Sequence, residues 1–136
     1  MCNLPYQLKL ADLKVTSLFK TQTGFNLTRY VIMLALKKQG TLTQSVIQRQ
    51  LKIDNAAVTR HLKSLETQGY VVRRRNPQNN REIVVSLTNG ARQALAHCGE
   101  TAADQTLLTA FSQQFSPQQV AQLADLLKQL NQLTLS

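Results

Sequence analysis

The sequence contains few cysteines, few acidic residues and no long apolar run. Two cysteines in 136 residues are too few for a disulfide framework. A run of about 18 apolar residues, which a membrane span needs, does not occur, and the N-terminus has no basic segment followed by an apolar one. We therefore expect one globular domain over residues 1–136, located in the reducing cytoplasm.

Motifs of catalysis are also absent from the sequence. There is no Gly-rich phosphate loop, no HExxH and no nucleophile elbow, and the two histidines, His61 and His97, provide no plausible triad. Near neighbours on a helix point in different directions, so His97, Cys98 and Glu100 cannot converge on one ion. We expect no enzyme, no cofactor and no metal site. Cys98 is expected to pack in the core, whereas a redox role for Cys2 stays open.

The shortage of acidic residues is confined to the middle of the chain. The whole sequence has 16 Lys and Arg against 7 Asp and Glu, a net charge of +9. Twelve of the bases and three of the acids lie between Arg29 and Arg92, and twelve minus three leaves the entire excess there. Such a segment is typical of polyanion binding. A solvated surface that keeps the protein in solution is the other interpretation.

Hydrophobic spacing predicts four helices in the first half of the chain. An amphipathic helix is expected over residues 4–20, and a second from an N-cap at Thr28 to about residue 39. Thr43 can begin a short third helix. Asp54 can cap a fourth that continues to about Gln68.

The second half begins with a change of hydrophobic period. Residues 70–88 hold two β-branched runs separated by the turn-forming stretch 76–80, which predicts a β-hairpin. Thr88 can begin a long helix, and Ser116 to Gln119 form a capping box for the last one. The expected fold is mostly α with a small β-hairpin.

The helix after Asp54 has two different faces. Val58, Leu62 and Leu65 recur at helical spacing and predict an inner face, which leaves the polar side chains to point outward. An α-helix fits the DNA major groove, where Arg and Asn can bind guanine and adenine edges. The candidate DNA-binding residues on this helix, the helix before it and the hairpin are Thr43, Ser45, Asn55, Ala56, Thr59, Arg60, Lys63, Arg73, Arg74, Arg75 and Arg81.

The arginines of the hairpin suggest two kinds of DNA contact. Arg73, Arg74 and Arg75 are expected along phosphates, although one of the three should cover the sheet with its aliphatic stem. Arg81 follows the polar turn and is placed to enter a minor groove, where A·T tracts concentrate negative potential.

Three stretches between Leu27 and Leu95 together resemble the MarR family of bacterial winged-helix regulators. They are LTRYVIMLAL, GTLTQSVIQRQLKIDNAAVTRHLKSLETQGYVVRR and REIVVSLTNGARQAL. The resemblance implies a winged helix-turn-helix over residues 27–88, flanked by dimerisation helices in residues 1–26 and 89–136. It also implies that Arg81 is the wing-tip arginine. Where the family usually has an acidic residue two positions earlier to orient that arginine, this sequence has Asn79.

The resemblance also implies a function and its partners. A homodimeric, nucleoid-associated repressor would bind a pseudo-palindromic operator and be released by a small apolar or phenolic effector. Phe19, Phe25 and Tyr30 lie near where the effector pocket would form, although packing in the core is the better explanation for them. The alternative is a winged-helix interaction or architectural module that binds DNA through charge alone.

Overall fold

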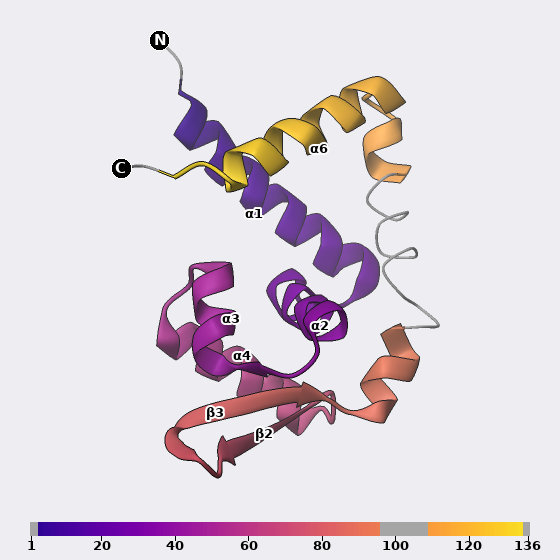
Figure 1. Ribbon diagram of the computed structural model, residues 1–136. Coiled ribbons are helices and arrows are strands. Elements are labelled where there is room, and N and C mark those ends of the chain that lie inside the picture. Colours follow the sequence, from indigo (N-terminus) through magenta and orange to yellow (C-terminus); the bar gives the residue numbers. More distant parts are fainter. Residues whose placement is uncertain (1–2, 96–108, 135–136) are drawn as a thin grey trace.

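The computed structural model describes residues 3–95 and 109–134 (Figure 1). Its elements are α1 (Leu4–Thr23), α2 (Leu27–Gln39), β1 (Leu42–Thr43), α3 (Gln44–Leu51), α4 (Asn55–Thr67), β2 (Val71–Asn76), β3 (Asn79–Leu87) and α6 (Pro117–Asn131). Residues 89–95 and 109–112 are helical as well. The fold is mostly α with one small antiparallel sheet, which confirms the expected fold class.

The expected capping residues begin α3, α4 and α6. The Thr43 hydroxyl accepts a hydrogen bond from the Val46 amide, and the Asp54 carboxylate accepts one from the amide three residues on. Ser116 and Gln119 form both bonds of a capping box. Each of these bonds satisfies an amide that the helix itself leaves without a partner. The helix boundaries predicted at these three positions are therefore confirmed.

The predicted N-cap of α2 is wrong. Asn26, not Thr28, has the extended backbone of a cap, and its side-chain oxygen accepts a hydrogen bond from the Arg29 amide at 3.1 Å. Asn and Thr are both favourable caps, so composition could not decide between positions two residues apart. Gly24, with φ of 75°, ends α1 just before this cap. The connection between α1 and α2 is consequently short.

The hairpin is tighter than predicted, and the sheet has a third strand. Only Pro77 and Gln78 separate β2 from β3, instead of the five residues expected in the turn. The register shifts next to Asn76, which pairs with Asn79. β1 pairs with the other edge of β3, with Leu42 opposite Val85, so the strand order is β1-β3-β2. A strand of two residues is too short to show any alternation in the sequence.

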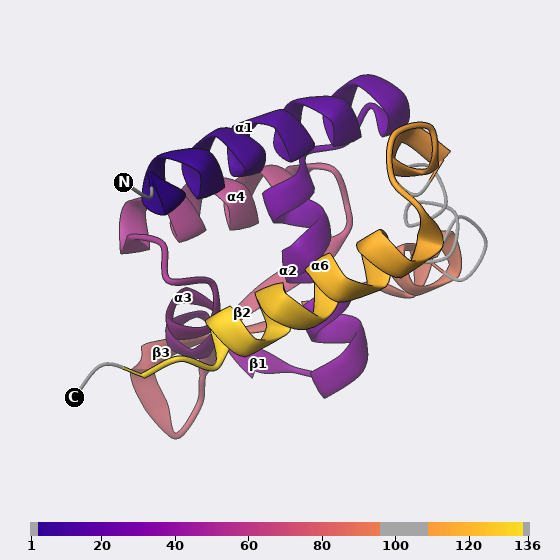
Figure 2. The same cartoon turned by 90° about the horizontal axis from the view of Figure 1, so that it is seen from above.

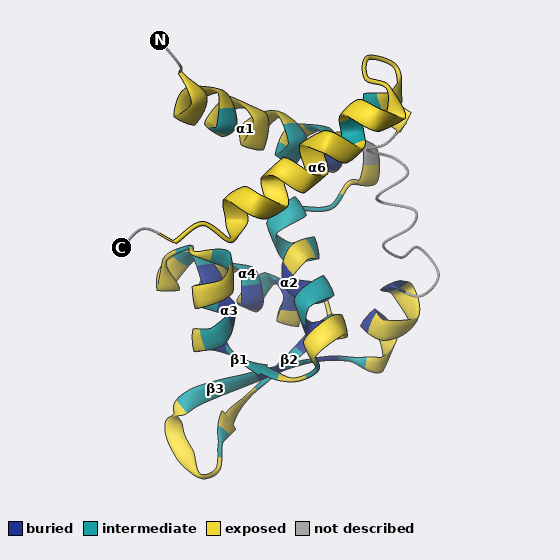
Figure 3. Cartoon of the chain, turned by 45° about the horizontal axis from the view of Figure 1, so that its top comes forward, coloured by how far each residue is buried: buried dark blue, intermediate teal, exposed yellow. Residues whose placement is uncertain are grey.

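A single apolar core lies between the helices and the sheet. Its largest fully buried side chains come from α2, α3, α4 and two strands: Ile32, Leu36, Ile47, Val58, Leu62, Leu65, Val71 and Val85. Burial of each such side chain contributes about 1.5–3 kcal/mol. Figure 3 shows the buried parts gathered in α2, α3, α4 and the sheet. The predicted inner face of α4 is confirmed, and this core determines how α4 presents its other face.

α1 and α6 lie at one end of the molecule, and the sheet lies at the other (Figure 1). Seen from above, the two helices run in a similar direction and stand apart from one another (Figure 2). No residue of α6 is buried. We call its exposed leucines the apolar face of α6: Leu123, Leu126, Leu127 and Leu130. This face is unusually apolar for a surface in contact with water.

Candidate nucleic-acid interface

α4 presents a polar face that its buried face holds in place. Asn55, Ala56, Arg60 and Lys63 are exposed, as the sequence predicts. They lie around the helix from the fully buried side chains of the core. The helix N-terminus adds a partial positive charge that favours a phosphate nearby. One anchored helix thus carries groups suited to base edges and groups suited to phosphates.

Thr59 is less available than its neighbours. It is half-buried, and its hydroxyl donates a hydrogen bond to the Asn55 carbonyl at 2.9 Å. The same oxygen accepts a hydrogen bond from Gln44 Nε2 at 2.9 Å. Among the two candidates on the preceding segment, Ser45 is exposed, whereas Thr43 is half-buried and its hydroxyl caps α3. The Thr59 and Thr43 hydroxyls therefore both form hydrogen bonds within the chain, whereas Ser45 is exposed.

Gln44 is a residue of this region that the sequence reading missed. It is the first residue of α3 and only 8% exposed, yet it is polar. Its side-chain nitrogen donates to Thr59 and, at 3.4 Å, to Asn55 Oδ1. A signal was present, since Gln44, Ile47 and Leu51 follow the spacing of three and four that marks one helix face. An inward-facing glutamine at the start of α3 needs partners, and α4 supplies them.

The three consecutive arginines of β2 divide into two kinds. Arg74 and Arg75 are exposed. The Arg73 side chain is only 17% exposed and pairs with Glu66 of α4, with Nη2 and Oε1 3.2 Å apart. The Arg73 amide also donates to Glu66 at 3.3 Å, and these bonds hold the pKa of the Glu66 carboxyl below its usual value. The placement of Arg73 fits the expectation that one of the three covers the sheet, and it attaches β2 to α4.

The tip of the hairpin is held by amide side chains. Asn79 Oδ1 accepts a hydrogen bond from the backbone amide of Arg81 at 3.2 Å, and Asn76 donates to Glu82 at 3.0 Å. Asn79 therefore binds the backbone of Arg81 and does not contact its guanidinium in this bond. The Arg81 side chain is exposed, and Arg75 donates to the Asn80 carbonyl beside it. A defined turn thus carries an arginine whose head group extends into solvent.

A polar contact also joins α2 to α4. Arg29 Nε donates a hydrogen bond to His61 Nδ1 at 3.2 Å. Burial lowers the pKa of His61, and the Arg29 and Arg60 guanidiniums lower it further. The imidazole is therefore neutral at pH 7, as its role of acceptor requires. This pairing spans 32 positions of sequence and had no local signal.

The three aromatic residues suggested for effector binding pack within the protein. Phe19 is buried against Tyr30, with the ring centroids 5.1 Å apart. Phe25 meets Tyr70 edge-on at 5.8 Å. Phe25 and Tyr30 also pack against the core. Their positions agree with the core-packing alternative.

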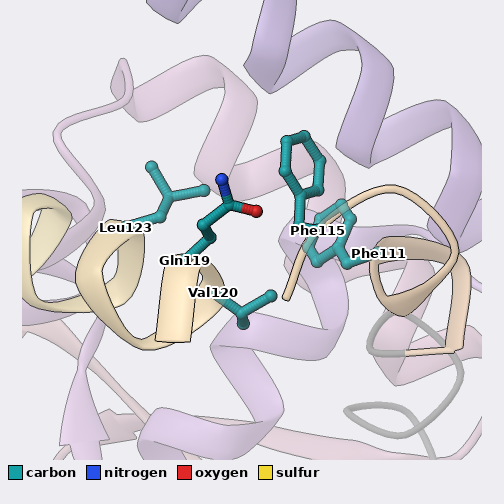
Figure 4. A pocket seen from close by; sticks show the side chains of 5 residues that line it. All are labelled: Phe111, Phe115, Gln119, Val120 and Leu123. Carbon is teal, nitrogen blue, oxygen red and sulfur yellow. The ribbon is translucent and has the colours of Figure 1, made fainter. Parts of the chain in front are cut away.

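A hollow lies elsewhere, at the start of α6 (Figure 4). Its volume is about 240 Å³. Phe111 and Phe115 stand edge to face at 6.4 Å on one side. Gln119, Val120 and Leu123 complete the lining. The lining is therefore apolar except for one amide.

The absence of a metal site and of a membrane span, both expected from the sequence, can be examined only in the part of the chain that the structure describes. Within residues 3–95 and 109–134, no three His, Cys, Asp or Glu side chains approach closely enough to share a metal ion. His97, Cys98 and Glu100, together with Cys2, lie outside the described residues. Among the helices that are described, none combines the length and apolarity that a membrane crossing needs.

The arrangement of α3, α4 and the hairpin defines a winged helix-turn-helix protein. The family model described as "MarR family" matches residues 25–83. Over 90 residues the chain is 39% identical to the uncharacterised HTH-type transcriptional regulator YdgJ of Bacillus subtilis, covering 66% of this chain and 55% of that protein. These two matches over the winged region confirm the resemblance to the MarR family. It spans about half the length of the curated relatives that it matches.

Solved structures support the same fold across nearly the whole chain. A probable transcriptional regulator from Pseudomonas aeruginosa has a TM-score of 0.81 and 25% identity, covering 94% of this chain and 96% of that one. A MarR mutant from E. coli, complexed with operator DNA, has a TM-score of 0.77 and 23% identity, covering 93% and 92%. Both similarities extend over the flanking helices as well as the winged region.

Proposed function

We propose that this protein is a homodimeric transcription regulator that binds double-stranded DNA at specific sequences, with α4 in the major groove. The observation that carries the proposal is the division of α4 into an anchored face and an exposed face. Asn55, Arg60 and Lys63 extend from a helix whose opposite side is locked in the core. Side chains on a rigid helix can recognise base edges, because their positions are already set before binding.

The hairpin supports the proposal through its charge. Arg74, Arg75 and Arg81 are exposed on an element attached to α4 by Arg73 and Glu66. In the proposed complex, the first two bind phosphates and Arg81 enters the adjacent minor groove. The positive charge of residues 29–92 strengthens both kinds of contact and makes binding depend on salt.

The apolar face of α6 supports the homodimer. Four exposed leucines on one helix give a surface that a second copy of the chain can cover by a two-fold axis. In the proposed dimer, α1, the helical residues 89–95 and 109–112, and α6 form the dimerisation layer. The two α4 helices would then enter successive major grooves about 34–36 Å apart on a pseudo-palindromic operator.

The repressor role and its release are the finer part of the proposal. The apolar hollow next to α6 is a better candidate for the effector than the packed aromatics Phe19, Phe25 and Tyr30. A small phenol bound there would act by favouring one arrangement of the dimer over another. A set of small phenols should raise the midpoint of thermal unfolding and weaken DNA binding together. A compound that does the first without the second would refute release by an effector.

The test of DNA recognition compares selected and random duplexes. The full chain is incubated with a random duplex library, the bound fragments are sequenced, and affinity for the selected duplex is measured. We expect at least about a thousandfold preference over random DNA at physiological salt. Arg60→Ala and Lys63→Ala should each reduce that affinity, because both side chains extend from the exposed face of α4.

The outcomes distinguish a regulator from an architectural module. Equal affinity of the unaltered chain for selected and random DNA would support binding by charge alone. Arg81→Ala should weaken binding mainly to duplexes with A·T-rich flanks. A uniform loss across all duplexes would assign Arg81 to phosphate contact instead.

A further inference from the structure

The first turns of α3 and α4 are joined by one buried amide. Gln44 reaches from α3 to Asn55 and Thr59, which lie on successive turns of α4. We propose that Gln44 is a positioning residue that holds the Asn55 carboxamide with its oxygen inward, so that Asn55 can act toward DNA only as a hydrogen-bond donor. The inference rests on the proposed function, since it concerns how α4 would recognise a base.

The hydrogen bonds of Thr59 determine which end of the Gln44 amide faces α4. The Thr59 hydroxyl gives its proton to the Asn55 carbonyl at 2.9 Å, so its oxygen is left to accept from Gln44. The Gln44 nitrogen must therefore face α4. The side-chain atom of Asn55 that meets this nitrogen is Oδ1, an acceptor, at 3.4 Å. The Asn55 nitrogen consequently points away from Gln44, on an exposed side chain.

The other end of the Gln44 amide shows that the arrangement is not explained by stability alone. Gln44 Oε1 is buried and has no hydrogen-bond partner within the part of the chain that the structure describes. A buried acceptor without a partner destabilises a fold, whereas an apolar side chain of similar size would not. What the amide supplies and an apolar side chain cannot is a fixed orientation of Asn55.

A donor-only Asn55 prefers particular bases. The usual pair between asparagine and adenine needs Oδ1 to accept from the adenine N6 while Nδ2 donates to N7. In the proposed complex, Oδ1 is engaged by Gln44 and the Asn55 nitrogen is the group that faces the groove. Guanine presents two acceptors, N7 and O6, on its major-groove edge. We therefore infer that Asn55 favours guanine over adenine at the base it meets.

The experiment compares Gln44→Met with Gln50→Met. Both replace a glutamine of α3 by an apolar side chain of similar length, but the Gln50 amide bonds with Gln39 of α2, away from α4. The unaltered chain and both variants select duplexes from a random library, and affinities are then measured for each single-base change. Gln44→Met should raise the affinity for adenine relative to guanine at one position per half-site by about fivefold or more. Gln50→Met should leave that ratio unchanged.

A second variant keeps Gln44 and changes the group that it holds. Asn55→Asp retains an acceptor for Gln44 but presents only acceptors to the groove. Its preferred base should change from guanine to cytosine, whose N4 is a donor. This variant tests the inference even if Gln44→Met fails to fold, which thermal unfolding of each purified variant reveals.

The outcomes separate this inference from the proposed function. If the unaltered chain selects no sequence, the proposed function itself fails. If it selects a sequence and Gln44→Met weakens all duplexes equally, Gln44 only stabilises the fold and the inference is overturned. The inference is also overturned if Asn55→Asp keeps the base preference of the unaltered chain. A preference that changes at one base pair in Gln44→Met supports it, and so does the change from guanine to cytosine in Asn55→Asp if Gln44→Met does not fold.

Discussion

At the scale of single residues, neighbours on α4 have opposite roles. Leu62 is fully buried in the core, while Lys63, the next residue, is exposed on the polar face. A helix turns by about a hundred degrees per residue, so adjacent positions belong to different environments. Stability and recognition therefore depend on different side chains of the same helix and can be separated by mutation.

Substitution of these two neighbours should separate the two properties. Leu62→Ala removes buried volume and should lower the free energy of unfolding by about 2–5 kcal/mol. Lys63→Ala should change it by no more than about 0.5 kcal/mol, because the side chain is exposed. Urea unfolding measures both. Lys63→Ala should also reduce the salt dependence of DNA binding by one phosphate contact. A large loss of stability in Lys63→Ala would contradict the assignment of faces.

The His61 imidazole should make stability depend on pH. Its pKa is lowered in the folded state, by burial first and by Arg29 and Arg60 next. Below the ordinary value of about 6.5, the unfolded chain therefore binds more protons than the folded chain. This contribution to stability is complete above about pH 6.5 and is lost as the pH falls through the folded pKa. Unfolding midpoints measured between pH 7 and 5 should fall more steeply for the unaltered chain than for His61→Gln. Equal slopes would rule out the contribution.

Whether the environment of a residue could be predicted from the sequence depends on how far along the chain its contacts lie. The two faces of α4 follow from spacing within 13 residues, and the prediction was confirmed. The pairs of Arg29 with His61 and of Arg73 with Glu66 depend on how separate elements meet. No periodicity in one segment contains that information. Gln44 lies between these cases, since its spacing marked an inward face but not its partners.

At the scale of elements, the turn between α3 and α4 contains a strained position. Lys52, which ends α3, has φ of 54°, the left-handed conformation that favours glycine. The turn is short, because Asp54 caps α4 two residues later. The capping signal at Asp54 located the start of α4 correctly. β1 could not be predicted, because it depends on pairing with β3. The start of α2 could not be fixed, because Asn26 and Thr28 are both favourable caps.

Glycine at position 52 should relieve this strain. Lys52→Gly removes the Cβ that disfavours the left-handed conformation, although the more flexible unfolded chain offsets part of the gain. We expect a net stabilisation of about 0.5–1 kcal/mol by urea unfolding. Lys52→Ala is the matched control, since it removes the same charge and keeps the Cβ. A similar gain in both variants would attribute the effect to charge instead of backbone conformation.

At the scale of the whole molecule, charge and apolar surface lie in different parts. The excess of basic residues lies between residues 29 and 92, while the bases and acids outside that range cancel. The exposed leucines of α6 lie at the end of the molecule away from the sheet. In the proposed complex, this separation leaves one end of the chain for a partner copy and the other end for DNA. The two ends are joined by α1 and α2 through the Phe19 and Tyr30 contact.

The apolar face of α6 should determine both the oligomeric state and the affinity for DNA. Leu126 is 61% exposed, so Leu126→Glu should not unfold the isolated chain but should place a charge within the proposed dimer interface. Light scattering at micromolar concentration should give a dimer for the unaltered chain and a monomer for Leu126→Glu. Affinity for a selected palindromic duplex should fall by about a hundredfold or more, since each α4 would then bind independently. Ala121→Glu adds the same charge to the opposite face of α6 and should leave both properties unchanged. A monomeric unaltered chain would refute the dimer.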